Sequence, residues 1–124
     1  MEECFFCKSI NNKDYELENE FAVARFDDFP VNKGHLEIIT KRHVKDWWGT
    51  TKEERIAIFD LLDEAKKIVD SKYNPDGYNI GMNLGAKAGQ SVMHLHVHLI
   101  PRFEGDVPNP KGGVRGIISN KQNY

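Results

Sequence analysis

The segment Val92-Met-His-Leu-His-Val-His-Leu-Ile100 constrains the fold of this 124-residue chain more than any other part of the sequence. Its histidines alternate with apolar residues, and successive side chains of a β-strand point to opposite faces of a sheet. The alternation therefore predicts a strand over residues 92–100, ended by Pro101. One face of this strand carries His94, His96 and His98, and the other directs Met93, Leu95, Val97 and Leu99 into the core.

A long helix is predicted in the middle of the chain, from Thr51 to Tyr73. Thr51 and Glu54 have the spacing of a capping box, in which a hydroxyl lies three residues before a carboxylate. Asn74-Pro-Asp-Gly77 is typical of a helix end. The helix has one apolar face, formed by Ile58, Leu61, Leu62, Ala65, Ile68 and Val69.

Further strands are predicted over residues 21–26, 35–40 and 78–82, with a weaker alternation over 14–18. Short turns join these segments, so they favour an antiparallel sheet with the long helix on one face, which is the α+β class. At 14.3 kDa the chain has the size of one domain, predicted over residues 1–106. Residues 107–124 are rich in Gly, Pro, Asn and Lys and are expected to form a C-terminal arm.

Charge and hydropathy exclude several classes of partner. The chain has 17 Lys and Arg against 19 Asp and Glu, and therefore lacks the basic excess that binding to a nucleic-acid backbone requires. No apolar run approaches the roughly 20 residues of a membrane helix. The first residues lack the pattern of a secretory signal. We therefore expect a cytoplasmic protein with neither a nucleic-acid nor a membrane partner.

The histidine-bearing face admits three interpretations from the residues alone. It is a polar surface without a function, a zinc site built from imidazole nitrogens, or a catalytic site. In the third case a neutral imidazole attacks phosphorus or an acyl carbon while its neighbours orient it and transfer protons. Gly85, Gly89, Gln90 and Ser91 lead into the triplet, and glycines with nearby donors suit a bound anion. This loop favours the catalytic interpretation.

Cys4 and Cys7 form a C-x-x-C pair near the N-terminus. In a reducing compartment this spacing indicates metal or redox chemistry more than a structural disulfide. No βαβ pattern surrounds the pair, so a thioredoxin-like role has little support. The alternative is two small buried side chains beside Phe5 and Phe6. The residues alone leave both interpretations open.

The sequence resembles the histidine triad family. Residues 89–100 are similar to its signature, H-φ-H-φ-H-φ-φ with φ apolar, preceded by Gly-Gln-Ser. Residues 27–35 resemble its ribose-binding loop and first active-site histidine, and residues 41–43 resemble its Lys/Arg-His segment. Pro101-Arg-Phe-Glu-Gly-Asp106 resembles the stretch after the triad in the fragile histidine triad branch. The resemblance covers most of residues 4–106.

The resemblance implies a role for each matched residue. His96 is the nucleophile that attacks an α-phosphorus and becomes nucleotidylated. His98 binds the phosphate and assists proton transfer, and His35 supports the nucleophile. Carboxylates are good partners for a vicinal diol, and amide or hydroxyl donors suit an oxyanion. The substrate-binding residues implied in this way are Asp27 for the ribose, with Asn83, Gln90 and Ser91 for the phosphate and leaving group.

The resemblance also implies a structural zinc ion and no organic cofactor. Two sulfurs and two nitrogens make a closed tetrahedral ligand set. The fold it implies is a five-stranded antiparallel sheet with one long and one short helix. That sheet is extended across a homodimer, with the long helix at the interface. The implied zinc ligands are Cys4, Cys7, His43 and His94.

The expected activity is cleavage at the α-phosphate of a purine nucleotide conjugate in two steps, through a nucleotidyl-His96 and then water. Hydrolysis of a dinucleoside polyphosphate is expected first, because of the stretch 101–106, and phosphoramidate hydrolysis is the alternative. Phosphate could replace water as the acceptor. Outside this class stand a metallohydrolase with catalytic zinc on the triad histidines and a nucleotide-binding adaptor. A metallohydrolase would lose activity with a chelator and would form no covalent intermediate. An adaptor would keep its biological role in His96→Ala.

Overall fold

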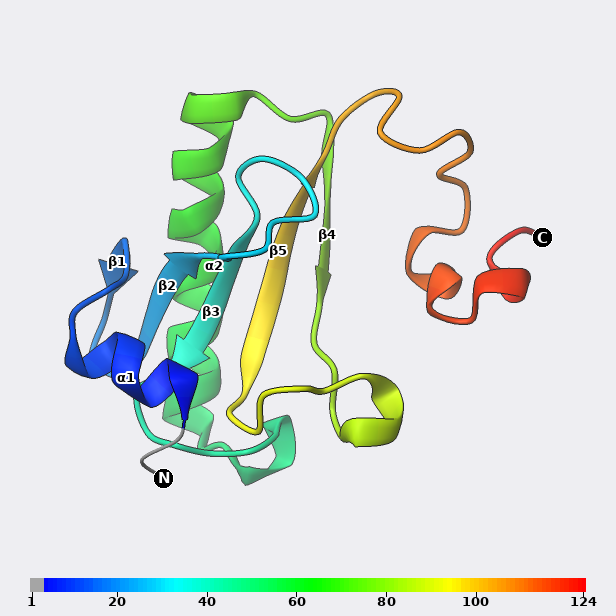
Figure 1. Ribbon diagram of the computed structural model, residues 1–124. Helices are drawn as coiled ribbons and strands as arrows, with labels where there is room; N and C mark the ends of the chain where they lie inside the picture. Colours follow the sequence, from blue (N-terminus) through cyan, green and yellow to red (C-terminus); the bar gives the residue numbers. More distant parts are fainter. Residues whose placement is uncertain (1–3) are drawn as a thin grey trace.

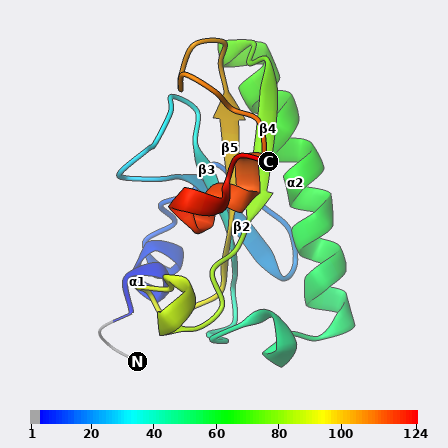
Figure 2. The same cartoon turned by 90° about the vertical axis from the view of Figure 1, so that its right-hand side faces the viewer.

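The computed structural model describes residues 4–124 and contains one five-stranded antiparallel sheet (Figure 1). The strand order is β1-β2-β3-β5-β4. The strands are β1 (Leu17–Glu18), β2 (Ala22–Phe26), β3 (Leu36–Thr40), β4 (Gly77–Gly81) and β5 (His96–Arg102). The helices α1 (Phe5–Asn11) and α2 (Lys52–Tyr73) cover opposite faces of the sheet (Figure 2). The predicted α+β fold, a five-stranded antiparallel sheet with one long and one short helix, is confirmed.

The long helix α2 begins and ends where its capping residues require. The Thr51 hydroxyl accepts a hydrogen bond from the Glu54 amide at 3.1 Å, and the Glu54 carboxylate accepts one from the Thr51 amide at 2.8 Å. These bonds satisfy two donors that the first helical turn leaves free. Asn74 has a φ of 51° and ends the helix in the left-handed conformation. Capping therefore confirms the predicted helix.

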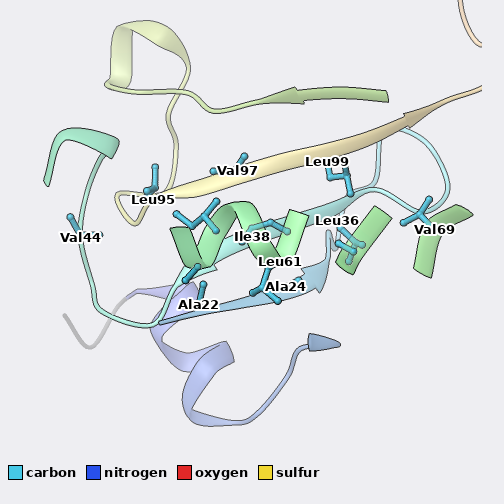
Figure 3. Close-up of a cluster of buried hydrophobic side chains, with 13 residues drawn as sticks. Ala22, Ala24, Leu36, Ile38, Val44, Leu61, Val69, Leu95, Val97 and Leu99 are labelled. Atoms are coloured by element: carbon cyan, nitrogen blue, oxygen red, sulfur yellow. The ribbon is translucent and has the colours of Figure 1, made fainter. Parts of the chain in front are cut away.

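The main core lies between α2 and the sheet (Figure 3). Side chains from β2, β3 and β5 alternate, so one residue in two points at the helix. Each fully buried Leu or Ile contributes about 1.5–3 kcal/mol to the free energy of unfolding. The core residues labelled in the figure on these strands and on α2 are Ala22, Ala24, Leu36, Ile38, Val97, Leu99, Leu61 and Val69.

The strand that bears the histidines differs from its prediction at both ends. β5 begins at His96, because residues 92–95 form bends and the Leu95 amide donates to the Val44 carbonyl at 2.7 Å. Met93 is 40% exposed, so its predicted place in the core is wrong. Pro101 does not end the strand. Pro101 lies beyond Leu99, the last residue of β5 that pairs with β3, and its carbonyl accepts a hydrogen bond from Asn32 at 3.0 Å. No β3 residue therefore requires the N–H that proline lacks.

The C-terminal arm lies beyond the edge strand β4 (Figure 1). It contains two short 3-10 turns, Gly113–Ile117 and Ser119–Lys121. None of the helices within residues 4–124 is both long and apolar enough to cross a membrane.

Candidate functional site

The sheet face opposite α2 carries the histidines of β5. His96 lies directly across from Ile39 on β3, and His98 lies across from Glu37. The centroids of the two imidazole rings are 5.1 Å apart. On its other side His98 is paired with Gly81 of β4, and the space that a side chain would fill there is open. The face is therefore crowded on the β3 side of His98 and accessible on the β4 side.

Hydrogen bonding determines the tautomer of His96. Its Nδ1 lies 2.9 Å from the backbone carbonyl oxygen of His94. A carbonyl only accepts, so Nδ1 carries the proton and Nε2 keeps an unprotonated lone pair. The Phe6 ring of α1 packs against the imidazole, with centroids 4.9 Å apart. A buried imidazole held in this way is oriented for nucleophilic attack through Nε2.

His98 acquires its tautomer from a short chain of donors. The Val31 amide donates to Nδ1 of His35 at 3.2 Å, so the proton of His35 is on Nε2. That nitrogen donates to Nδ1 of His98 at 2.9 Å, which places the proton of His98 on its Nε2. The Asp27 carboxylate lies 3.5 Å from His35 and 3.9 Å from His98. The site thus presents an acceptor nitrogen on His96 and an N–H donor on His98.

Burial sets the charges of this group. It lowers the pKa of His98 to about 4, assisted by the neighbouring His96 and His35, and His98 is therefore neutral at pH 7. Burial also lowers the pKa of His35. Burial also acts on Asp27 and raises its pKa. Hydrogen bonds with the Phe29 amide and the Glu37 side chain, together with the electrostatic effect of His35 and His98, outweigh burial, so the pKa of Asp27 is lowered. An ionised carboxylate therefore lies beside two neutral imidazoles.

His94 lies beside α1, like His96, but its ring nitrogens have other partners. Its Nε2 donates to the Thr40 carbonyl at 2.7 Å, which leaves the lone pair on Nδ1. That Nδ1 lies 3.3 Å from Sγ of Cys4 and 3.6 Å from Sγ of Cys7. Sγ of Cys7 lies 3.3 Å from Nδ1 of His43. The four ligand atoms are all within 4.8 Å of one another, and two thiolates with two imidazoles fit tetrahedral zinc, whose ligands are about 3.5 Å apart.

The triad histidines therefore do not act as one set. His94 precedes β5, so its predicted place in the strand is wrong, but its ring lies on the same side of the sheet as His96, because Phe6 of α1 packs against both rings. Among the described residues, His94, His96 and His98 do not form a convergent group of ligand atoms. This geometry does not support the metallohydrolase alternative.

The loop before β5 is held together by Gln90. Its carbonyl oxygen accepts from the Gly85 amide at 2.9 Å, and its nitrogen donates to the carbonyls of Lys45 at 2.8 Å and Val92 at 3.1 Å. The buried amide is thus engaged with backbone and not directed at a phosphate. Ser91 is exposed and Asn83 is half-buried, with its side chain 3.9 Å from where a Cβ of Gly89 would lie.

Two residues of this face were absent from the sequence-based prediction, Arg25 and Glu37. Their side chains are each 4% exposed and form an ion pair, with 2.8 Å between Nη1 of Arg25 and Oε2 of Glu37. The sequence signal that could have found them is one charged residue inside each of two predicted strands that are otherwise mainly apolar. Its meaning depends on the β2–β3 register, which places the two residues directly opposite each other.

Comparison with known proteins identifies the family. The model of the HIT domain matches residues 10–105. A HIT-like protein of Mycoplasma pneumoniae is 38% identical over 104 residues, which are 82% of this chain and 72% of that protein. An AP-4-A phosphorylase of Mycobacterium tuberculosis is 37% identical over 88 residues, 70% of this chain but 45% of the phosphorylase. The chain belongs to the HIT domain family.

Solved structures agree with this assignment. A HIT family protein of Bacillus anthracis superposes with a TM-score of 0.79 at 36% identity, covering 84% of this chain and 76% of the other. A protein of Sulfolobus tokodaii, described as a hypothetical histidine triad nucleotide-binding protein, gives a TM-score of 0.77 at 31% identity, covering 86% and 73%.

Proposed function

We propose that the protein cleaves nucleotide conjugates at the α-phosphate through a covalent nucleotidyl-His96. The observation that carries the proposal is the tautomer of His96, whose Nδ1–H is bound by the His94 carbonyl and whose Nε2 is free. In the first step Nε2 forms a bond to phosphorus while the bond from phosphorus to the leaving group breaks. Nε2–H of His98 donates a hydrogen bond to the departing oxygen and stabilises its developing negative charge. In the second step water displaces His96 and AMP is released.

Asp27 is the proposed ribose ligand. Its carboxylate stays ionised, and a carboxylate accepts both hydrogen bonds of a vicinal diol. One of its oxygens accepts from the Phe29 amide at 2.8 Å, which fixes the carboxylate in the loop. Asn32 of the same loop donates to Asp106 at 2.8 Å, and Arg102 binds that carboxylate as well. The end of β5 thereby supports the ribose loop.

The proposed substrate class is a dinucleoside polyphosphate. The AP-4-A phosphorylase of Mycobacterium tuberculosis supports it, as does the stretch 101–106. The open space on the Gly81 side of His98 offers room for a leaving group. Nucleoside phosphoramidates are the alternative substrate, and phosphate is the alternative acceptor to water. A nucleotide-binding adaptor would bind the same ligands without forming the covalent intermediate.

Intact-mass spectrometry tests the covalent step. The parent and His96→Gly are each incubated with diadenosine tetraphosphate and with an adenosine phosphoramidate, and the products are separated. We expect a transient AMP adduct on the parent, AMP among its products, and neither from His96→Gly. The thermal midpoint of the variant controls for folding. Turnover by a folded His96→Gly, or no adduct and no turnover by the parent, would contradict the proposal.

We further propose that Cys4, Cys7, His43 and His94 hold a structural zinc ion. When bound, zinc would link α1 to the residue before β5 and would take no part in the chemistry. The convergence of the four ligand atoms supports this site. Reduced thiols at the site also agree with a cytoplasmic location.

A homodimer is proposed from exposed apolar residues on β4 and on α2. β4 is an edge strand of the sheet, and Ile80 on it is 52% exposed. On α2, Ile56 is 49% and Phe59 55% exposed. Pairing of two β4 strands would extend the sheet and cover apolar surface at the edge.

A further inference from the structure

A second group of side chains with the chemistry of metal ligands lies inside the candidate active site. Asp27, His35 and His98 each offer one ligand atom, and these atoms lie within 4.8 Å of one another. Oδ2 of Asp27 is 3.5 Å from Nε2 of His35 and 3.9 Å from Nδ1 of His98, and the two nitrogens are 2.9 Å apart. Two imidazoles with one carboxylate are a ligand set for divalent transition metals. Spacing and ligand type alone would therefore permit zinc here.

Zinc bound to this group would conflict with the chemistry proposed above. The ion would take the Nδ1 lone pair of His98 and the Asp27 carboxylate, which is the proposed ribose ligand. Nucleotide and zinc would then compete for the same atoms. A feature that admits zinc to the cysteine cluster but not to this group would keep the site open to its substrate.

The two clusters differ in the group that stands behind an imidazole. A metal-bound histidine usually donates its other ring N–H to a carbonyl, a carboxylate or a water, which leaves the lone pair for the metal. His94 has this arrangement, because its Nε2 donates to the Thr40 carbonyl and its Nδ1 faces the cysteines. His35 has the reverse arrangement. Its Nδ1 accepts a hydrogen bond at 3.2 Å from the backbone amide of Val31, and a backbone amide only donates.

The proton of His35 consequently points at the other two ligand atoms. Histidine binds metals as the neutral imidazole, so Nε2 of His35 can become a ligand only if this proton moves to Nδ1. Two N–H groups, those of His35 and Val31, would then face each other. His35 is only 3% exposed, and a buried donor without an acceptor is costly. The Val31 amide therefore opposes metal binding at Nε2 of His35.

We propose that the Val31 backbone amide is a positioning group that excludes zinc from the active site by holding the proton of His35 on Nε2. A carbonyl behind His94 prepares one cluster for the ion, and an amide behind His35 closes the other. The side chain of Val31 is 66% exposed, so the backbone carries this role. Only the benefit to catalysis rests on the proposed function. The preference for one cluster over the other does not depend on it.

Val31→Pro tests the proposal, because proline has no backbone N–H. Val31→Ala is the matched control, since it shortens the side chain and keeps the amide. Each protein is equilibrated with buffered free zinc, its zinc content is measured by elemental analysis, and affinity is measured by competition with a chromophoric chelator. We expect Val31→Pro to hold one more zinc ion per chain than the parent and Val31→Ala. Its affinity for that ion should exceed the parent's by about tenfold to a hundredfold, the range over which outer hydrogen-bond partners change metal binding.

Two further proteins show that the effect comes from the missing N–H and arises at this cluster. Proline also restricts the loop, so a second replacement puts the α-hydroxy acid of valine at position 31. The resulting ester lacks the same N–H and keeps the side chain. It should gain the same extra ion. Val31→Pro combined with His98→Ala should lose that ion and keep the zinc of the cysteine cluster. Thermal midpoints report whether each protein is folded.

The readout is metal content and not activity, so it separates this inference from the proposed function. An extra ion in the ester and in Val31→Pro supports the exclusion even in a protein that turns over no nucleotide. The proposal is overturned by a parent that already binds zinc through His98. It is overturned as well if the folded ester gains no ion, or if Val31→Ala gains as much as Val31→Pro. An active parent with either result would leave the proposed function standing without the exclusion.

Discussion

The imidazole of His98 owes both its charge and its orientation to neighbours rather than to solvent pH. Burial keeps it neutral down to about pH 4, so its protonation state is constant across the range in which cells operate. What remains to be decided is which nitrogen carries the single proton. His35 determines this nitrogen through one hydrogen bond of 2.9 Å to Nδ1 of His98, which places the proton on Nε2. The Val31 amide in turn orients His35.

His35→Leu should therefore impair the chemical step more than binding. The variant keeps the bulk of the side chain but removes the donor to Nδ1 of His98, so that nitrogen is free to carry the proton instead. We expect kcat at pH 7 to fall about a hundredfold, as when one donor to a developing oxyanion is lost, with KM changed less than threefold. Steady-state kinetics check this, and an unchanged kcat in a folded His35→Leu would contradict it.

At this scale the sequence predicted residues whose chemistry is visible in a motif. His96, His98, His35 and Asp27 were all named from it, and the structure brings them to one face. The hydrogen-bond partners of the side chains were harder to predict than the residues themselves. Gln90 looked like a phosphate ligand, but it is bonded to the Lys45 carbonyl, which folding brings from a segment 45 residues away.

Among the elements, α1 depends most on contacts outside itself. It has seven residues, which is too short for a helix to be stable in isolation. Of its side chains Phe6 is buried, packed with Val23 and Ile39 of the sheet. Its N-terminal end is attached separately, where Cys4 and Cys7 meet His43 and His94.

Removal of the proposed zinc ion should accordingly release α1 before the rest of the fold. We expect one zinc per chain by elemental analysis, and loss of it in Cys7→Ser or with a strong chelator. Hydrogen exchange should then accelerate over residues 5–11 while α2 stays protected, and the thermal midpoint should fall by roughly 10 °C. Lys8→Ala, at an exposed position of the same helix, serves as a control. Full protection of α1 in metal-free protein would count against the site.

The elements differed in how well they could be predicted. α2 has its own capping box and a long apolar repeat, both local in sequence, and its bounds were correct to one residue. The start of β5 was not predictable, because residues 92–95 continue the same alternation as the strand. Their backbone bonds to Val44 instead of to β3, and this choice is made by tertiary contacts.

For the molecule as a whole, the sheet ends at β4 in an edge that nothing within the described chain pairs with. The sequence indicated an antiparallel sheet from the turns, and the number of strands came from the family resemblance. The order of the strands is not readable from local pattern, because it depends on which segments meet after folding.

Substitutions on β4 and α2 should dissociate the proposed dimer. Sedimentation should give twice the chain mass of 14.3 kDa for the parent. Ile80→Lys combined with Phe59→Asp should give the single-chain mass, because both place charge in the buried interface. Phe29→Lys, at a side chain that is 87% exposed on the β2–β3 loop, is the control and should remain dimeric. A monomeric parent at micromolar concentration would contradict the assembly.

The contact between the first helix and the residues before β5 also has a consequence for synthesis. Cys4 and His94 are 90 residues apart in the sequence, and Phe6 packs on His96 from the same helix. A nascent chain therefore exposes its cysteines long before the ribosome has made the residues that enclose them. The proposed nucleophile, His96, is synthesised only after about three quarters of the polypeptide, so we expect prematurely terminated chains to lack activity.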